Sequence, residues 1–182
     1  SLNGVNGFRI DGIDANDNSG SFISGAGDVN GDGIDDLIVG AQGADPPDVG
    51  GGDRSGAGES YVVFGAASFA SSLALSSLNG TNGFRADGID ANDDSGESVS
   101  GAGDINGDGF ADVIIGADGA NGSAGESFVI FGGNFTSSVT NVGSTAADTL
   151  NGSGVIDILF GGLGADTLIG NGGADVLRGG AG

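Results

Sequence analysis

The sequence predicts an all-β protein, and three observations support this prediction. The chain of 182 residues contains 42 Gly, and Gly is among the poorest helix formers. No apolar stripe recurs at the helical period of 3.6 residues. Short β-branched or aromatic runs are instead bounded by Gly, Asn and Asp, which is typical of strands joined by turns. These runs are FRI, DLIVGA, YVVFG, DVIIGA and FVIFG.

Composition limits the partners and the chemistry of the chain. It carries 25 acidic and 4 basic residues, a net charge of −21, which would repel nucleic acids and anionic membranes. No run approaches the roughly 20 apolar residues of a membrane helix, so membrane insertion is not expected. The absence of Cys excludes disulfides and thiolate metal sites. Since His and Lys are also absent, we find no catalytic constellation and expect a protein that is not an enzyme.

Residues 1 to about 135 contain two copies of one unit. Residues 1–20 return as 77–96, and GESYVVFG at 58–65 returns as GESFVIFG at 125–132. The second copy is shorter because it lacks part of the Pro- and Gly-rich segment at 41–58, which is predicted to be an irregular loop. We place the units at 1–76 and 77–135. At their boundary, SFASSLALSS at 68–77 fits either a brief helical turn or a strand.

Each unit contains an acidic loop directly before an apolar strand. If Asp28 is position 1, oxygen-bearing side chains stand at positions 1, 3, 5 and 9, Gly33 stands at position 6, and a backbone carbonyl is available at position 7. Gly at position 6 permits a sharp turn, and such an oxygen set suits Ca²⁺. An EF-hand needs Glu at position 12, whereas Val39 stands there, so chelation would have to close at position 9. The expected ligands are Asp28, Asn30, Asp32, Ile34 and Asp36 in the first copy, and Asp104, Asn106, Asp108, Phe110 and Asp112 in the second.

The alternative is that D-x-N-x-D-G forms only a turn, because Asp, Asn and Gly favour turns. Two copies in register, both keeping the acid at position 9, favour a metal site. GAGDVNGDGIDDLIVGA followed by GESYVVFG resembles the FG-GAP repeat of integrin alpha subunits and bacterial surface proteins. The resemblance implies propeller blades, here two four-stranded antiparallel units, with calcium bound at D-x-D/N-x-D-G-x-x-D.

Three other repeated features are expected to be structural. IDANDNSG at 13–20 and its copy at 89–96 lack Gly at position 6 and an acid at position 9, so polar turns are favoured over metal loops. Arg9 and Arg85 are expected to pair with nearby carboxylates rather than to bind an anionic ligand. Glu59 and Glu126 could suggest glycoside hydrolysis as a pair, but their duplication points to a structural role in each unit.

A second repeat begins at 143, after a Ser/Thr/Asn-rich linker at 136–142. Its acidic residues are nine apart, and each precedes a Leu by two positions; they are Asp148, Asp157, Asp166 and Asp175. We expect a parallel β-roll at 143–182, with Ca²⁺ held between stacked turns and the leucines in a thin core. The nonapeptides resemble RTX (repeats-in-toxin) calcium-binding repeats of secreted bacterial proteins. The match is specific at 161–178 and degraded at 143–151 and 152–160.

Together, these features predict an extracellular calcium-binding structural or adhesive segment of a larger secreted bacterial surface protein, with calcium driving its folding. Two blades do not close a propeller of about 4–8 blades. Either further blades lie outside these residues, or exposed blade edges self-associate into a filament or lattice. The alternatives are a non-catalytic accessory region of a secreted RTX-type hydrolase and a glycan-binding propeller fragment. Other than calcium, the expected partners are a second copy, a cell-surface protein or a glycan.

Overall fold

The computed structural model describes residues 2–47, 54–133, 139–142, 147–152, 158–160, 165–172 and 176–179. In these residues the all-β prediction is confirmed, since the helical elements are limited to α1 (Ala120–Ser123) and a 3₁₀ turn, η1 (Leu75–Ser77). None of the described helices is long and apolar enough to cross a membrane.

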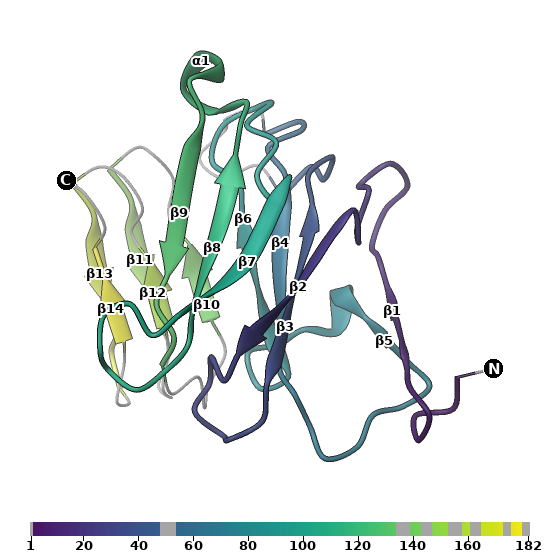
Figure 1. Cartoon of the computed structure of the whole chain (residues 1–182). Coiled ribbons are helices and arrows are strands. Elements are labelled where there is room, and N and C mark those ends of the chain that lie inside the picture. The colour runs from purple at the N-terminus through teal and green to yellow at the C-terminus, as the bar shows by residue number, and fades with distance from the viewer. Residues whose placement is uncertain are drawn as a thin grey trace.

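Two antiparallel sheets lie within residues 22–130 (Figure 1). The first has the order β2-β3-β4-β6 and comprises β2 (Phe22–Gly27), β3 (Asp36–Ala41), β4 (Glu59–Val63) and β6 (Gly83–Asp87). The second has the order β7-β8-β9 and comprises β7 (Ser98–Gly103), β8 (Asp112–Ala117) and β9 (Glu126–Ile130). The described part of the second sheet thus has three strands, where the sequence predicted four.

The difference arises because the first sheet takes its fourth strand from the second sequence copy. β6 lies in the second copy but pairs with β4 of the first. Its counterpart in the first copy, β1 (Arg9–Asp11), instead pairs in parallel with β5 (Ser72–Ala74). The G-F-R-x-D sequence that forms β6 does not recur after β9. Equivalent sequence segments therefore have different partners.

The core has two parts, one on each face of the first sheet. One cluster lies between the two sheets and includes Ile38, Val62 and Phe84 from the first and Val113 and Ile115 from the second. Another lies on the opposite face of the first sheet, under β1, β5 and η1, and includes Val39, Tyr61, Val63 and Leu75. Residues 68–77 therefore contain both the strand and the helical turn that their sequence allowed.

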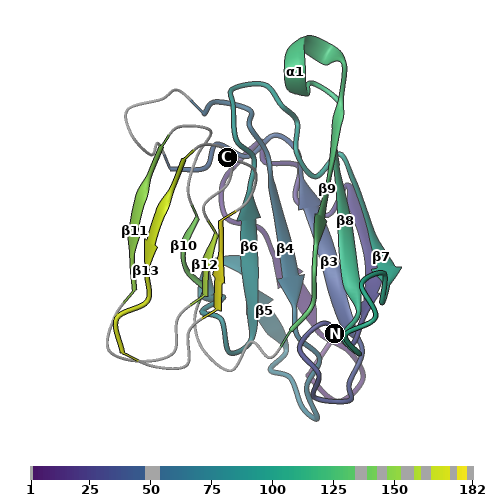
Figure 2. The ribbon, with the colours of Figure 1, turned by 90° about the vertical axis from the view of Figure 1, so that its left-hand side faces the viewer.

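The C-terminal strands pair in parallel (Figure 2). β10 (Val139–Val142), β12 (Ile158–Phe160) and β14 (Val176–Arg178) form one ladder, and β11 (Thr149–Asn151) and β13 (Thr167–Ile169) form another. Leu150 is aligned with Leu168 and Leu159 with Leu177. Each aligned pair is 18 residues apart, which is two nonapeptides, so successive nonapeptides contribute strands to alternate ladders.

Candidate calcium-binding loops

The first acidic loop, residues 28–36, is wrapped around the carboxylate of Asp28. One carboxylate oxygen accepts hydrogen bonds from the backbone N–H groups of Gly31 at 2.7 Å and Asp32 at 3.0 Å, and the other accepts from Gly33 at 2.8 Å. Gly31 and Gly33 have φ values of 78° and 85°, a region that favours Gly because a Cβ is strained there. The tight turn predicted at position 6 is therefore confirmed.

Asn30 and Asp32 are joined to each other in the same loop. The Asn30 side-chain oxygen accepts from the Asp32 N–H at 2.9 Å, and the Asn30 amide group donates to Asp32 Oδ2 at 3.1 Å. Asp32 Oδ1 accepts from the Ile34 N–H at 2.8 Å. The Asp32 side chain remains exposed and that of Asn30 half-buried, so both can be reached from solvent.

Asp36, the acid at position 9, lies in a different environment. Its exposed fraction is 1%, and its two carboxylate oxygens accept from Val29 N–H at 2.8 Å and Gly65 N–H at 2.7 Å. Burial raises the pKa of Asp36 to about 6, against the opposing effect of the two backbone hydrogen bonds. Asp36 thus ties the loop to the segment that follows β4.

The second loop, residues 104–112, repeats this arrangement. Asp104 accepts from the N–H groups of Gly107, Asp108 and Gly109 at 2.7, 3.1 and 2.9 Å. Asp112 accepts from Ile105 and Gly132 at 2.8 and 2.9 Å. Asn106 and Asp108 make the same paired contacts, and Asp108 also accepts from Phe110 N–H at 3.0 Å. Two loops related only by sequence repetition therefore share one hydrogen-bond pattern.

The loops fit a hard cation by the chemistry of their donors. Every candidate ligand supplies oxygen, which Ca²⁺ and Mg²⁺ prefer, and Ca²⁺ accepts 6–8 such ligands in flexible geometry. No three acidic side chains of the described residues form a ready-made metal cluster, and in both loops the backbone amides hold the first and last carboxylates. A carboxylate has about four acceptor positions, so Asp28, which accepts three amide hydrogen bonds, and Asp36, which accepts two, each retain acceptor capacity. Asp28, Asn30, Asp32, Asp36 and the Ile34 carbonyl would hold the ion.

The two loops lie next to each other at one end of their sheets (Figure 1). The Ala111 N–H donates to the Asp28 carbonyl at 2.9 Å, and the Gly133 N–H donates to the Val29 carbonyl at 2.9 Å. The Phe110 ring covers Gly31 so closely that a Cβ on Gly31 would lie 2.3 Å from a ring carbon. The candidate sites are therefore in direct contact.

Comparison with known families locates these loops within described repeats. The FG-GAP repeat matches residues 19–63 and 95–130, which include both acidic loops. The RTX calcium-binding nonapeptide repeat, in four copies, matches residues 151–182. The chain carries FG-GAP repeats followed by RTX calcium-binding nonapeptide repeats. Its cofactor is therefore Ca²⁺. No curated protein matches the chain.

Both families found are structural or binding repeats rather than catalytic ones, and both are typical of extracellular or secreted proteins. The FG-GAP match leaves out residues 1–18 and 64–94, which include β1, β5 and β6. The matched parts are therefore the three strands β2, β3 and β4 and their counterparts β7, β8 and β9.

In the RTX segment, the described candidate ligands are Asp148 and Asp166, whereas Asp157 and Asp175 lie outside the described residues. The Asp148 N–H donates to one Asp166 carboxylate oxygen at 2.9 Å, and the Thr167 N–H donates to the Asp148 carbonyl at 2.8 Å. The other Asp166 carboxylate oxygen is buried without a hydrogen-bond partner. A buried carboxylate oxygen in this state is costly unless a cation satisfies it, which fits the Ca²⁺ expected between RTX turns.

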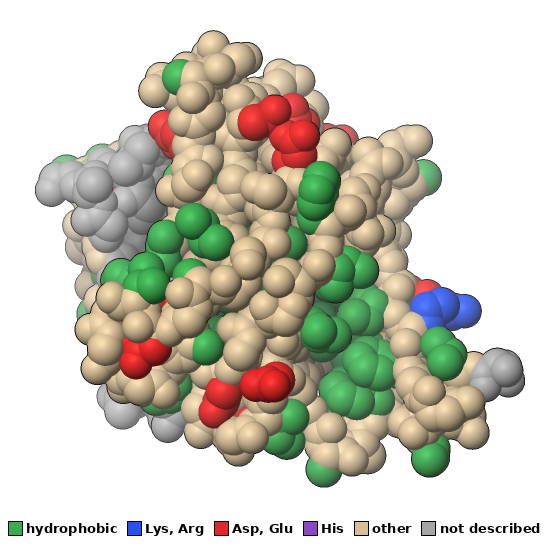
Figure 3. Space-filling model, in the orientation of Figure 1, with side chains coloured by type: hydrophobic (Ala, Val, Ile, Leu, Met, Phe, Trp, Pro, Cys, Tyr) green, Lys and Arg blue, Asp and Glu red, His purple; other side chains and the backbone are tan. Residues whose placement is uncertain are grey.

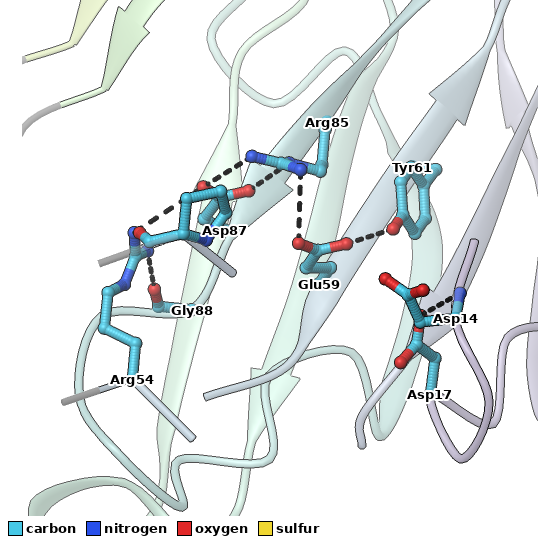
Figure 4. Close-up of polar contacts among 9 residues, drawn as sticks. Asp14, Asp17, Arg54, Glu59, Tyr61, Arg85, Asp87 and Gly88 are labelled. Atoms are coloured by element: carbon cyan, nitrogen blue, oxygen red, sulfur yellow. Dashed lines mark hydrogen bonds and ion pairs between the residues drawn. The ribbon is translucent and has the colours of Figure 1, made fainter. Parts of the chain in front are cut away.

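Of the repeated Arg and Glu residues, Arg85 and Glu59 belong to an ion-pair network on the first sheet (Figure 4). Arg85 lies 3.3 Å from Glu59 and donates to Asp87 at 3.1 Å, and the Tyr61 hydroxyl donates to Glu59. Burial raises the pKa of Glu59, whereas the Tyr61 hydrogen bond and the Arg85 charge lower it. The predicted pairing of Arg85 and Arg9 with carboxylates is confirmed, since Arg9 donates to Asp11 at 3.0 Å.

Sequence reasoning missed Arg54, which joins this network from the loop before β4. Its guanidinium lies 3.6 Å from Asp87 and donates to the carbonyls of Gly88 and Pro47. The side chain is buried, which is unusual for Arg unless it is paired. The signal was weak because Arg54 lies in the part of the loop that the second copy lacks. In contrast, Glu59, Arg85 and Asp87 all have counterparts in the other copy.

Proposed function

We propose that this chain is a calcium-dependent structural segment of a larger secreted bacterial protein, in which Ca²⁺ drives folding. The observation that best supports the proposal is that the 28–36 and 104–112 loops share one hydrogen-bond pattern. Each loop is an all-oxygen donor set next to a buried strand. A net charge of −21 opposes compaction, and bound divalent cations offset that repulsion. Because the ion binds only the folded loop, its binding free energy adds to the folding free energy.

The proposed architecture has two parts. The sheets of residues 1–135 act as two FG-GAP blades, the first of which is completed across the boundary at 76 and 77 by β6 of the second unit. Residues 143–182 form a parallel β-roll, supported by the two alternating parallel ladders, with Ca²⁺ between turns at Asp148, Asp157, Asp166 and Asp175. Leu150 and Leu159, which are buried, would form the thin core of this roll. In this proposal the segment is a scaffold that stiffens at extracellular calcium concentrations and contributes to surface attachment or self-association.

A calcium titration of site variants tests the proposal. We expect Asp32→Ala and Asp108→Ala each to remove about one bound ion in isothermal titration calorimetry. Circular dichroism should show calcium-induced strand formation in the parent chain. Asp35→Ala is the matched control, because Asp35 is an exposed acid of the same loop whose counterpart in the second copy is already Ala111. Unchanged stoichiometry in both site variants, or equal loss in the control, would contradict the proposal.

A further inference from the structure

In the described part of the chain, one edge of strand β9 has no partner strand, although the sequence of β9 closely matches that of the buried strand β4. β4 pairs with β3 on one side and β6 on the other, and all five of its residues are buried. β9 pairs with β8 alone in the described part of the chain, and Glu126 and Ser127 are exposed. Val129 is 41% exposed, whereas its counterpart Val62 is 1% exposed. Hydrophobic side chains gather over β8 and β9 on the face shown in Figure 3.

The first sheet shows which strand covers such an edge. β6 runs antiparallel to β4, with Tyr61 aligned with Arg85 and Val62 with Phe84. Phe84 packs into the core between the sheets, and Arg85 pairs with Glu59. The covering strand thus supplies backbone hydrogen bonds, an aromatic side chain and a charge that complements the Glu at the start of β4.

The sequence around β1 matches that of β6 except that Ile10 stands in place of Ala86, and in the described residues the edge of β1 that faces away from β5 has no partner strand. At the β4–β6 junction, the Phe64 N–H donates to Asn82 and the Gly88 N–H to Gly58. Because hydrogen-bonded pairs alternate along an antiparallel ladder, Phe84 and Ala86 turn their backbone groups toward β4. In β1 the Arg9 N–H donates to Ser71, on the β5 side. The counterparts of Phe84 and Ala86, namely Phe8 and Ile10, therefore turn their backbone groups to the opposite edge, which faces away from β5.

The side chains of β1 are also placed as those of β6 are. Ala86 packs against the cluster that contains Val113 and Ile115 of the second sheet. Its counterpart Ile10 packs against the cluster that contains Val39 of the first sheet. β1 thus packs on the face of the first sheet much as β6 packs on the face of the second. The edge of β1 that faces away from β5 corresponds to the edge with which β6 pairs with β4.

Charges on the two open strands complete the correspondence. The counterparts of Glu59, Arg85 and Asp87 in the other sequence copy lie on two different strands, β1 and β9. Arg9 and Asp11 lie together on β1 and are exposed or half-buried, and Glu126 is exposed on β9. Arg85 contacts both acidic partners, whereas the ion pair described for Arg9 is with Asp11.

We propose that the open edge of β9 binds β1 of a second copy of this chain. By analogy with β4 and β6, Phe128 would align with Arg9, Val129 with Phe8 and Ser127 with Ile10, and Arg9 would pair with Glu126. The chain's own β1 does not reach this edge, because β1 and β9 lie on opposite sides of the molecule (Figure 1). The contact is head-to-tail, so repeated binding generates open or ring-shaped assemblies. It deepens the self-association in the proposed function and rests on it, since calcium must first fold both loops.

Sedimentation velocity over a concentration series, at saturating Ca²⁺, tests the contact. We expect the parent chain to self-associate and Ser127→Pro to weaken association about tenfold or more, because Pro removes an outward N–H on β9 and obstructs the edge. Ser127→Thr keeps the N–H and should associate like the parent chain. Glu126→Arg should also weaken association, and Arg9→Glu in the same chain should restore it.

Engineered cysteines test the register, because the chain has no natural Cys. A mixture of the Ile10→Cys and Ser127→Cys chains should form a disulfide-linked heterodimer under oxidation, since hydrogen-bonded antiparallel pairs have Cα atoms about 5.5 Å apart. Ile10→Cys mixed with Ser98→Cys, an exposed position on β7, is the control and should not cross-link selectively.

Calcium stoichiometry and circular dichroism of the same samples separate the two proposals. Chains that bind calcium and fold, yet stay monomeric and do not cross-link, would overturn the β9–β1 contact and leave the proposed function standing. Cross-linking within single chains of the double-cysteine variant would also overturn it. So would a monomeric parent chain that binds an added peptide of residues 6–12, because the edge would then accept a strand of this kind without a second copy. Loss of calcium-dependent folding would contradict the proposed function itself.

Discussion

The Ala111 N–H donates a 2.9 Å hydrogen bond to the Asp28 carbonyl, and this bond joins the two acidic loops. Asp28 is position 1 of the first loop, and Ala111 directly precedes Asp112, position 9 of the second. The Phe110 ring also lies against Gly31. A movement of one loop on binding an ion would therefore displace the backbone of the other loop.

Calcium binding at the two loops should consequently be coupled. We expect Asp108→Ala to weaken calcium binding at the first loop by about fivefold or more, within the usual range of coupling between sites. Reciprocity requires Asp32→Ala to weaken the second loop by the same factor. Calorimetric titration of both variants measures the two factors. A remaining loop that binds calcium as in the parent chain would show that the contact does not transmit binding, and unequal factors would show that a substitution does more than empty its own loop.

Asp36 should stabilise the fold even without calcium, unlike Asp32. Asp36→Asn replaces one of two acceptor oxygens with an amide group that faces a backbone donor, either Val29 or Gly65. Leaving a buried donor unsatisfied costs about 1–3 kcal/mol of unfolding free energy. Asp32→Asn changes an exposed side chain and should have little effect in calcium-free buffer. Denaturant unfolding with and without Ca²⁺ compares them, and equal behaviour of the two variants in calcium-free buffer would argue against a structural role for Asp36.

Two glycines of the first loop should differ in what they tolerate. Gly33 has a φ of 85° and open space around its missing Cβ, so Gly33→Ala should cost only the conformational strain, about 1–2 kcal/mol. Gly31→Ala adds a clash with the Phe110 ring and should cost more. The matched test is Gly31→Ala in a Phe110→Ala background, where the extra cost should disappear. Its persistence there would place the origin of the cost elsewhere.

The sequence predicted the apolar strands and the loops, but neither the Gly-rich strands nor the pairing of β6 with the sheet of the first copy. β3 and β8 occupy the predicted runs at 36–41 and 112–117. β2 and β7 were missed because FISGAG and SVSGAG combine Gly and Ser, which have low strand propensity. Tertiary packing favours Gly there, since a Cβ on Gly101 would lie 2.7 Å from the Gly25 carbonyl oxygen. Repetition predicted equal roles for β1 and β6, and only the structure shows that their pairing partners differ.

The candidate ligands were likewise predicted as a set, but not their present partners. Spacing identified Asp28, Asn30 and Asp32 together, and the structure places them in one loop. The amides that hold Asp28 come from its own loop, whereas the hydrogen bond from Gly65 to the buried Asp36 depends on where the chain runs after β4. This is a long-range feature, because Gly65 is 29 residues from Asp36, and local spacing carries no information about it.

The buried carboxyl group of Glu59 should make stability depend on pH. Burial raises the pKa of Glu59 in the folded state above its ordinary value of 4.5. The carboxylate of Glu59 therefore binds a proton more readily in the folded chain than in the unfolded chain. The resulting stabilisation is fully present below pH 4.5 and is lost as the pH rises through the higher folded-state pKa. Glu59→Gln removes this titration. The stability of the parent chain relative to Glu59→Gln should therefore fall as the pH rises over this range, as measured by denaturant unfolding at several pH values. A flat difference would contradict the assignment.

The leucines of the RTX segment should contribute unequally to stability. Leu159 is 0% exposed and its aligned partner Leu177 is 47% exposed, although both occupy the same position in their nonapeptides. Leu159→Ala should lower the unfolding free energy of this segment by about 2–5 kcal/mol, because it removes buried apolar contacts and leaves a cavity. Leu177→Ala, the matched control, should cost far less, since a half-exposed side chain loses less burial. Hydrogen exchange of the strand amides in saturating Ca²⁺ reports the local change. Similar losses at both positions would mean that Leu177 is covered in solution, which would imply a further turn or a second molecule packed on that end of the ladder.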